Sequence, residues 1–163
     1  MLFRSNEPSC CRNLSTGVPS VIIEYGTDTT RTIASLIFSG VAARNPDVNF
    51  IFSHAGGTVT ALTERFNTQA VRLPHLKERG FNFDTVMAQI QRFYYDTAQA
   101  ANPIAMASLT KMVKVSQIVF GTDYPYRTGI EHVQGLGPLF NASELHAIDR
   151  DNALRILPAK WRG

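Results

Sequence analysis

Three short apolar segments, separated by helical patterns, constrain the fold of this chain more than any other feature. Val48–Ser53 is too short and too rich in Phe and Ile for a surface helix, which indicates a buried strand. Phe93–Thr97, which is aromatic, and Gln117–Phe120 are predicted as two further strands. Because helical patterns alternate with these segments, the sequence predicts an α/β fold in which crossover helices join parallel strands.

Apolar residues at helical spacing mark the predicted helices. A first amphipathic helix is expected to run through Ala43, with Asp28 or Thr29 capping its start. Val18–Tyr25, before it, is predicted as either a strand, on its β-branched content, or a loop, and Leu73–Gly80 as a turn or a short helix. The remaining predicted helices are Thr58–Phe66, Phe83–Gln91, Ile104–Val113, Gly129–Gln134, Ser143–Ile148 and Asp151–Leu157.

A length of 163 residues suits one domain with a sizeable core. The net charge is only +3, and Lys and Arg are scattered along the chain without forming a run. This distribution argues against both a nucleic acid and a membrane surface as the partner. No apolar segment approaches the ~20 residues that a membrane span needs, so no membrane partner is expected.

The amino-terminal stretch Met1–Gly17 contains Arg4 but no apolar centre, which distinguishes it from a signal peptide. It is expected to be a poorly ordered leader before a single domain, residues 18–163. Cys10 and Cys11 lie in this leader; they are adjacent and lack the spacing of a zinc site. Two reduced thiols are expected, and they favour a cytoplasmic location.

Polar residues stand at the carboxyl ends of the three predicted strands. His54 follows the first strand, and Gly56 and Gly57 after it let the backbone turn sharply. Asp96 ends the second strand, and Asp123 follows the third. The carboxyl ends of parallel strands share one face of a sheet or barrel, so these side chains are expected to converge. An imidazole and a carboxylate suit a divalent metal such as zinc, or equally a base and its orienting acid.

Each of these residues also has a purely structural interpretation. His54 alone is as readily a core histidine bonded to a backbone carbonyl. Asp123 is suited to capping the turn before Pro125, and Asp96 to starting a helix or anchoring a loop. By pattern alone, no role is assigned to the charged side chains on predicted helices and loops: Arg31, Arg65, His75, His132 and His146.

A series of ordered motifs runs along the chain between Pro19 and Pro158. The motifs are Thr29–Arg31, Phe38–Gly40, Asn45–Asp47, Ile51–Gly57, Tyr94–Ala98, Phe120–Pro125 and Asp151–Leu157. In this order and spacing they resemble the amidohydrolase-related group of the amidohydrolase superfamily. That group contains aminocarboxymuconate-semialdehyde decarboxylase and the salicylate- and resorcylate-type decarboxylases.

The resemblance implies a metal-binding (β/α)₈ barrel in which His54 ends the sixth strand and Asp123 the eighth. It implies that His54 acts on the substrate or on metal-bound water, and that Asp123 ligates the metal and handles protons. Both residues are therefore expected to be catalytic and to contact the metal. The implied chemistry is decarboxylation of a carboxylated aromatic or unsaturated small molecule, or hydrolysis by a metal-activated water.

Arg65 stands eleven positions after His54. At this distance the decarboxylase branch of the family carries an arginine that reaches the substrate carboxylate of a neighbouring subunit. A planar guanidinium binds a carboxylate bidentately, so the resemblance makes Arg65 a substrate-binding residue in a homo-oligomer. The alternative is an exposed helix arginine without a functional partner.

The chain also departs from the family pattern. It contains no His-x-His pair, with which the family's metal site begins, and its first histidine is His54. Its 163 residues are fewer than the ~250 typical of a (β/α)₈ barrel. The chain is therefore expected to be the C-terminal half of a barrel, to hold its metal (most readily zinc) weakly, to turn over little substrate by itself, and to associate through open sheet edges. A catalytically inactive fragment that acts only through association is the alternative.

Overall fold

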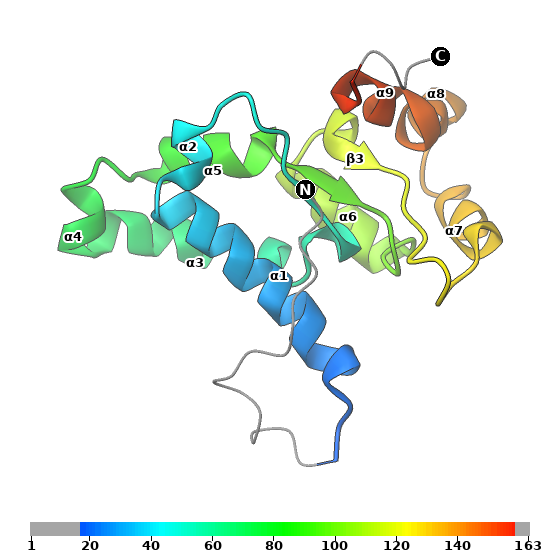
Figure 1. Ribbon diagram of the computed structural model, residues 1–163, viewed down its shortest axis with the longest axis horizontal. Helices are drawn as coiled ribbons and strands as arrows, with labels where there is room; N and C mark the ends of the chain where they lie inside the picture. Colours follow the sequence, from blue (N-terminus) through cyan, green and yellow to red (C-terminus); the bar gives the residue numbers. More distant parts are fainter. Residues whose placement is uncertain (1–16, 159–163) are drawn as a thin grey trace. The chain divides into compact units, whose positions relative to one another are not determined.

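The computed structural model describes residues 17–158 (Figure 1). Apart from Gly17, the predicted leader lies outside this range, and so do Cys10 and Cys11. The described chain divides into two compact units: residues 17–48 with 56–90, and residues 49–55 with 91–158. The first unit is helical, and the second contains the sheet.

The first unit is built on a long helix, α1, at Ser20–Phe38. Its apolar stripe is buried as helical spacing predicts, with Ile33 and Ile37 at most 1% exposed. The Phe38 ring packs against Phe66 and Phe81, with centroids 5.7 and 5.5 Å away. The other helices here are α2 at Val41–Arg44, α3 at Val59–Arg72, α4 at Pro74–Lys77 and α5 at Phe83–Arg92, whose last residues belong to the second unit.

The prediction for Val18–Tyr25 was wrong, because α1 begins at Ser20 and takes in most of this segment. Its β-branched side chains are exposed rather than buried in a sheet. The Thr29 hydroxyl donates to the Tyr25 carbonyl at 3.0 Å, one helical turn earlier. The hydroxyls of neighbouring threonines likewise donate to the carbonyls four residues before them. Thr29 and Asp28 therefore lie inside the helix and do not cap it.

Thr30 joins α1 to the loop before α3. Its hydroxyl oxygen accepts the Thr58 N–H at 2.8 Å and lies 3.0 Å from the Gly26 carbonyl oxygen and 3.2 Å from that of Gly56. The Thr30 side chain is buried. One hydroxyl thus satisfies polar backbone groups from both segments, which allows the helix and the loop to approach at Gly26 and Gly57.

The second unit contains a three-stranded sheet in the order β1-β2-β3, and neighbouring strands are parallel. β1 is Ile51–Phe52, β2 is Tyr94–Asp96 and β3 is Ile118–Val119. The predicted parallel arrangement is confirmed, although each strand is shorter than its apolar segment. The other elements of this unit include α6 at Pro103–Met112, a 3-10 turn at Val115–Gln117, α7 at Gly129–Leu136, α8 at Ala142–His146, a π-helical turn at Ala147–Asp151 and α9 at Asn152–Ile156.

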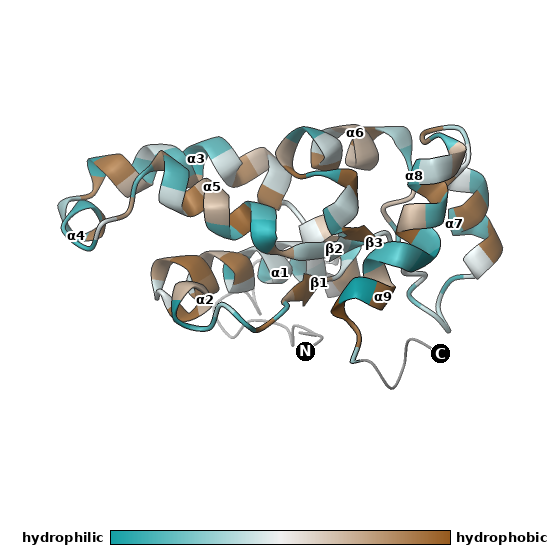
Figure 2. Cartoon of the chain, turned by 90° about the horizontal axis from the view of Figure 1, so that it is seen from above, coloured by the Kyte–Doolittle hydropathy of each residue, from teal (hydrophilic) through white to brown (hydrophobic). Residues whose placement is uncertain are grey.

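Aromatic rings fill the core beside the sheet, in which β1 and β3 are hydrophobic (Figure 2). The Phe52 ring lies 5.1 Å from that of Phe93 and 6.1 Å from that of Tyr95, between centroids. Tyr95 is fully buried, and burial raises the pKa of its phenol well above the ordinary value. Tyr95 therefore serves as a neutral core residue and not as a proton donor.

Two asparagines stabilise the starts of helices in the second unit. Asn102 caps α6 by accepting the N–H groups of Ile104 and Ala105 at 3.1 and 3.0 Å, with Pro103 in the first turn. Asn152, buried at the start of α9, donates to the Ile118 carbonyl of β3 at 2.7 Å. The sequence therefore builds an α/β unit with parallel strands, which confirms the predicted fold class.

Within residues 17–158, none of the helices combines the length and the apolar character that crossing a membrane would require.

Candidate active site

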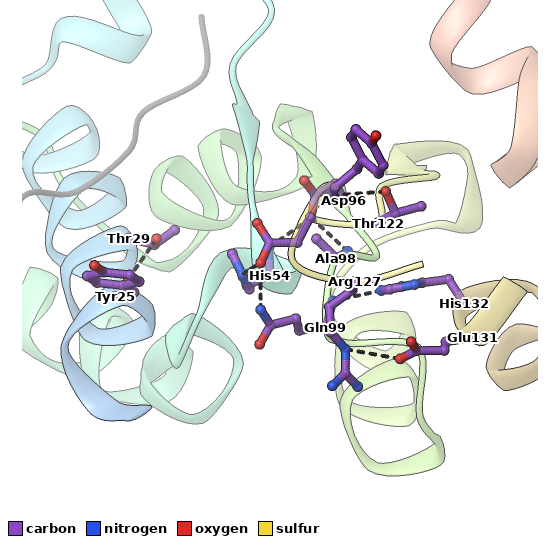
Figure 3. A network of polar contacts seen from close by, with 12 residues as sticks. Tyr25, Thr29, His54, Asp96, Ala98, Gln99, Thr122, Arg127, Glu131 and His132 are labelled. Carbon is purple, nitrogen blue, oxygen red and sulfur yellow. Dashed lines mark hydrogen bonds and ion pairs between the residues drawn. The ribbon is translucent and has the colours of Figure 1, made fainter. Parts of the chain in front are cut away.

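The residues predicted at the three strand ends converge within the second unit. His54 follows β1, Asp96 ends β2, and Asp123 follows β3. The Nε2 atom of His54 lies 3.9 Å from Oδ2 of Asp123, an ion-pair distance when the imidazole is protonated. The backbone N–H of His54 donates to Oδ1 of Asp96 at 2.8 Å (Figure 3). The parallel sheet thus brings an imidazole and two carboxylates to one edge.

The loops after the three strands hold the backbone in an unusual conformation. Among the described residues, four non-glycine positions have a left-handed backbone, and all four lie in these loops: His54, Ala55, Gln99 and Asp123, with φ between 51° and 61°. Such a conformation costs a non-glycine residue about 1–2 kcal/mol. Strain of this kind persists where the surrounding contacts impose it, and it gathers at functional sites.

Asp96 anchors the loop that carries His54. Its Oδ1 atom accepts both the His54 N–H, at 2.8 Å, and the Ala98 N–H, at 3.0 Å. Burial raises the pKa of Asp96 above its ordinary value, while these two N–H groups and the His54 charge oppose the rise and the Asp123 charge adds to it. This geometry agrees with the loop-anchoring interpretation of Asp96.

Gly121 allows the loop after β3 to pass close to Asp96. A Cβ atom at position 121 would stand 2.9 Å from both Cβ and Cγ of Asp96. The Thr97 hydroxyl links the same loops, because it donates to the Gly121 carbonyl and accepts the Gly121 N–H, both at 3.0 Å. Only glycine leaves room for the Asp96 carboxyl in this position.

The raised pKa of Asp96 predicts how its contribution to stability depends on pH. The unfolded chain releases this proton near 3.8, and the folded chain releases it at a higher pH. Between pH 3.8 and the raised pKa, the folded state binds more protons than the unfolded state. The stability that protonated Asp96 contributes is therefore complete below pH 3.8 and is lost as pH rises through the raised pKa. In Asp96→Asn, which keeps an acceptor oxygen, this dependence disappears. Urea denaturation of both proteins between about pH 3 and pH 7 should show the wild type losing stability relative to the variant; a constant difference would contradict the assignment.

The Asp123 carboxylate contacts Gln99 and not the following turn. Oδ2 of Asp123 accepts the Gln99 side-chain amide at 2.6 Å. The turn before Pro125 is closed by other groups, because Tyr126 N–H donates to the Asp123 main-chain oxygen and Tyr124 N–H to the Thr122 hydroxyl. The turn-capping interpretation of the Asp123 side chain is therefore not what the structure shows.

Two residues of this site carried no signal in the sequence, namely Gln99 and His132. The Gln99 N–H donates to Nε2 of His132 at 3.0 Å (Figure 3). Nδ1–H of His132 donates to the Thr128 carbonyl at 2.9 Å. Because 33 positions separate Gln99 from His132, no local pattern reports their contact.

A small pocket adjoins Gln99. Its volume is about 160 Å³, below the ~300–1,000 Å³ of pockets that enclose drug-sized ligands. Arg127 pairs with Glu131 at 3.1 Å at its rim, and the Thr128 hydroxyl, which donates to Glu131, lowers the pKa of that carboxyl. The lining residues are Gln99, Ala101, Asn102, Arg127, Glu131 and His132.

Arg65, the predicted substrate-binding residue, lies exposed on α3 in the first unit. His75 lies on α4 in the same unit, and His146 pairs with Asp151 at 2.9 Å on the exposed side of α8. Arg65 and His75 therefore lie in a different unit from His54, Asp96 and Asp123.

The described residues do not form a complete metal site. Within residues 17–158, no three His, Cys, Asp or Glu side chains are arranged to hold a metal ion. His54 and Asp123 supply two suitable donors, whereas Oδ1 of Asp96 is occupied by two backbone N–H groups. Since catalytic zinc takes about three protein ligands, this pair needs at least one further donor.

Comparison with known proteins gives matches along most of the chain. The family model described as Amidohydrolase matches residues 13–159. The decarboxylase yanB of Aspergillus niger is 34% identical over 149 residues, which cover 86% of this chain and 40% of that protein. The 6-methylsalicylic acid decarboxylase of Penicillium expansum is 30% identical over 112 residues, which cover 69% of this chain and 34% of that protein.

Solved structures share the fold. A dihydroxybenzoic acid decarboxylase from Polaromonas sp. JS666, with bound manganese and the inhibitor 2-nitroresorcinol, superposes with a TM-score of 0.79 at 15% identity. The superposition covers 95% of this chain and 48% of that one. The chain thus spans about half the length of this structure, and less of the curated relatives.

Proposed function

The chain belongs to the amidohydrolase family, and from this premise we propose that it forms the proton-handling edge of a decarboxylase for carboxylated aromatic acids. The observation that carries the proposal is the approach of His54 Nε2 to Asp123 Oδ2, 3.9 Å apart at the carboxyl edge of a parallel sheet. The activities named for the two fungal relatives support it. The chain covers less than half the length of either relative, so the activity named for those relatives is a proposal for this chain.

Non-oxidative decarboxylation of an aromatic acid is a proton exchange at carbon. A proton joins the ring carbon that bears the carboxylate, the bond to the carboxyl carbon breaks, its electron pair returns to the ring, and CO₂ leaves. An imidazole suits this step because it gains and releases protons near neutral pH. The His54 side chain is 29% exposed, so it is accessible to a substrate, and the Asp123 carboxylate balances the charge of its protonated form.

We propose a divalent metal as the cofactor, with Asp123 and His54 as the ligands that this chain offers. Manganese in the dihydroxybenzoic acid decarboxylase structure supports a divalent ion, and imidazole with carboxylate suits zinc equally well. Such an ion would polarise the oxygens of a bound acid. The pair is an incomplete ligand set, so such an ion would need at least one further donor.

The experiment that tests this function is a decarboxylation assay on the 163-residue chain. The chain is incubated with 6-methylsalicylate or 2,6-dihydroxybenzoate in D₂O, with Mn²⁺, with Zn²⁺ or with a chelator. The expected result is CO₂ release, with deuterium at the ring carbon that lost the carboxyl group, and loss of activity on chelation. No CO₂ under any of these conditions would overturn the proposal.

Arg65 is proposed to bind the substrate carboxylate, supported by its spacing from His54 and its exposure on α3. Because hydrogen bonds to charged groups contribute about 1.5–3 kcal/mol, Arg65→Ala should raise KM roughly 10- to 100-fold. Arg72→Ala, an exposed arginine of the same helix, is the matched control and should leave KM unchanged. Equal KM values for the two variants would count against a role for Arg65.

Association is the second candidate function, and the sheet favours it. Within the described residues β1 and β3 each pair on one side only, and unpaired strand edges invite another chain. We propose that residues 18–163 act as one amidohydrolase domain of a barrel, after a leader at 1–17, and that this domain associates through these edges. Light scattering of the purified chain should then report an oligomer; a monomer that melts cooperatively would argue against it.

The reduced state proposed for Cys10 and Cys11 supports a cytoplasmic location.

A further inference from the structure

We propose that Gln99 is a positioning residue of this site: it holds the Asp123 carboxylate oxygen that faces His54, and the buried His132 in turn holds Gln99. The catalytic consequence rests on the function proposed above, whereas the contact itself does not. The setting of His132, the backbone of Gln99 and the reach of its side chain each contribute to this assignment.

His132 is a fixed acceptor for the Gln99 backbone. Its side chain is buried, and Nδ1 lies 2.9 Å from the Thr128 carbonyl oxygen. A carbonyl oxygen can only accept, so Nδ1 carries the hydrogen and Nε2 presents its lone pair. Nε2 accepts the Gln99 N–H at 3.0 Å. The edge of the Phe120 ring faces the imidazole, with centroids 6.4 Å apart. Both nitrogens of His132 are thus satisfied, and its tautomer is determined by its partners.

This bond holds Gln99 in a strained backbone conformation. The φ angle of Gln99 is 51°, which costs a non-glycine residue about 1–2 kcal/mol. The loop therefore needs compensating contacts to keep Gln99 in this conformation, and the bond to His132 is one of them. The next residues, Ala100 and Asn102, close main-chain turns onto Thr97 and Ala100.

From this conformation the Gln99 side chain reaches Asp123. Its amide nitrogen lies 2.6 Å from Oδ2, and this is the oxygen that stands 3.9 Å from His54 Nε2. Asp123 itself has a φ of 61°, and its side chain is 18% exposed. One amide group therefore fixes the rotamer of the carboxylate at the point where it faces the imidazole.

The contact makes Gln99 act on His54 through Asp123. An amide N–H can only donate, so the Gln99 side chain holds Oδ2 of Asp123 as an acceptor beside His54 Nε2. A Gln99 that served only to anchor its loop through the backbone would leave this carboxylate unheld, and that difference makes the two interpretations separable.

Gln99→Asn is the decisive variant. Asparagine tolerates the left-handed backbone better than other non-glycine residues, so the N–H bond to His132 is kept. Its side chain is one methylene shorter and does not reach Oδ2. Gln99→Met, which keeps the side-chain length but has no hydrogen-bond donor, is the second variant. It decides the question if the loop around Gln99→Asn rearranges. Gln134→Asn, at an exposed position of α7, is the control.

The primary readout is the ¹⁵N spectrum of the histidine rings in the 163-residue chain. In the wild type, His132 should show hydrogen on Nδ1. Gln99→Asn should preserve that pattern and shift the His54 ring signals, and it should cause no further shift in an Asp123→Ala background, which has no side-chain acceptor for Gln99. His54 signals that match the wild type in both Gln99 variants would overturn the proposal.

Kinetics supply the second readout. Misplaced supporting contacts typically lower activity about 10- to 100-fold, so kcat of Gln99→Asn should fall by this factor while KM stays within about twofold. A wild-type kcat in this variant would also overturn the assignment. If the wild-type chain releases no CO₂, the proposed function fails, and the His54 ring signals still decide whether Gln99 positions Asp123.

Discussion

Replacing Asp123 with asparagine is expected to abolish decarboxylation without unfolding the chain. Asparagine has nearly the same shape, and its side-chain oxygen can still accept the Gln99 amide that contacts Oδ2 at 2.6 Å. The substitution removes the negative charge that stands 3.9 Å from His54 Nε2. General acid–base catalysis contributes about 10²- to 10⁴-fold, so kcat should fall at least about 100-fold, measured as CO₂ release at saturating substrate.

His54→Ala should have an effect as large, because it removes the group that exchanges the proton. The double variant should be no slower than the slower single variant, since the two residues act as one unit. Asp149→Asn, on the exposed side of the π-helical turn, is the matched control and should keep the wild-type kcat. A wild-type kcat in Asp123→Asn, at an unchanged melting temperature, would exclude this pair from the mechanism.

The parts of this fold that were predictable depend on neighbours in the sequence. Phe93–Thr97 was predicted as a strand because it is a short aromatic segment, and such segments are typical of buried strands. Tyr95 is fully buried in β2. The start of α6 was predictable because Asn102 and Pro103 act on the backbone within three residues. His54 and Asp123 could be expected at one edge because parallel strands align their carboxyl ends.

The unpredicted parts depend on contacts between distant residues. The exposed valine and isoleucines at the start of α1 carry the local signature of a strand, although the segment they belong to is helical. Gln99 and His132 meet across 33 positions, and the amide of Gln99 reaches Asp123 across 24. A glutamine has no spacing rule that would reveal such a contact, so the support of Asp123 becomes visible only in three dimensions.

Gly57→Ala is expected to be the most destabilising small substitution in the first unit. A Cβ atom at position 57 would overlap the Gly26 carbonyl oxygen of α1 and lie 2.7 Å from the carbonyl carbon. Gly57 also has a φ of 67°, which disfavours any side chain. Backbone strain and overpacking together cost about 2–5 kcal/mol, and the helix cannot withdraw without breaking the Thr30 contacts to Gly56 and Thr58.

Two matched glycines separate these costs. Gly80→Ala, at a φ of 82° with open space around it, should lose only about 1 kcal/mol through backbone strain. Gly26→Ala places its Cβ 3.7 Å from Gly57 Cα, an ordinary contact, and should gain about 0.5–1 kcal/mol as a helix-interior substitution. The free energy of unfolding in urea measures all three. If Gly57→Ala costs no more than Gly80→Ala, the close approach of Gly57 to the backbone of α1 does not exist in solution.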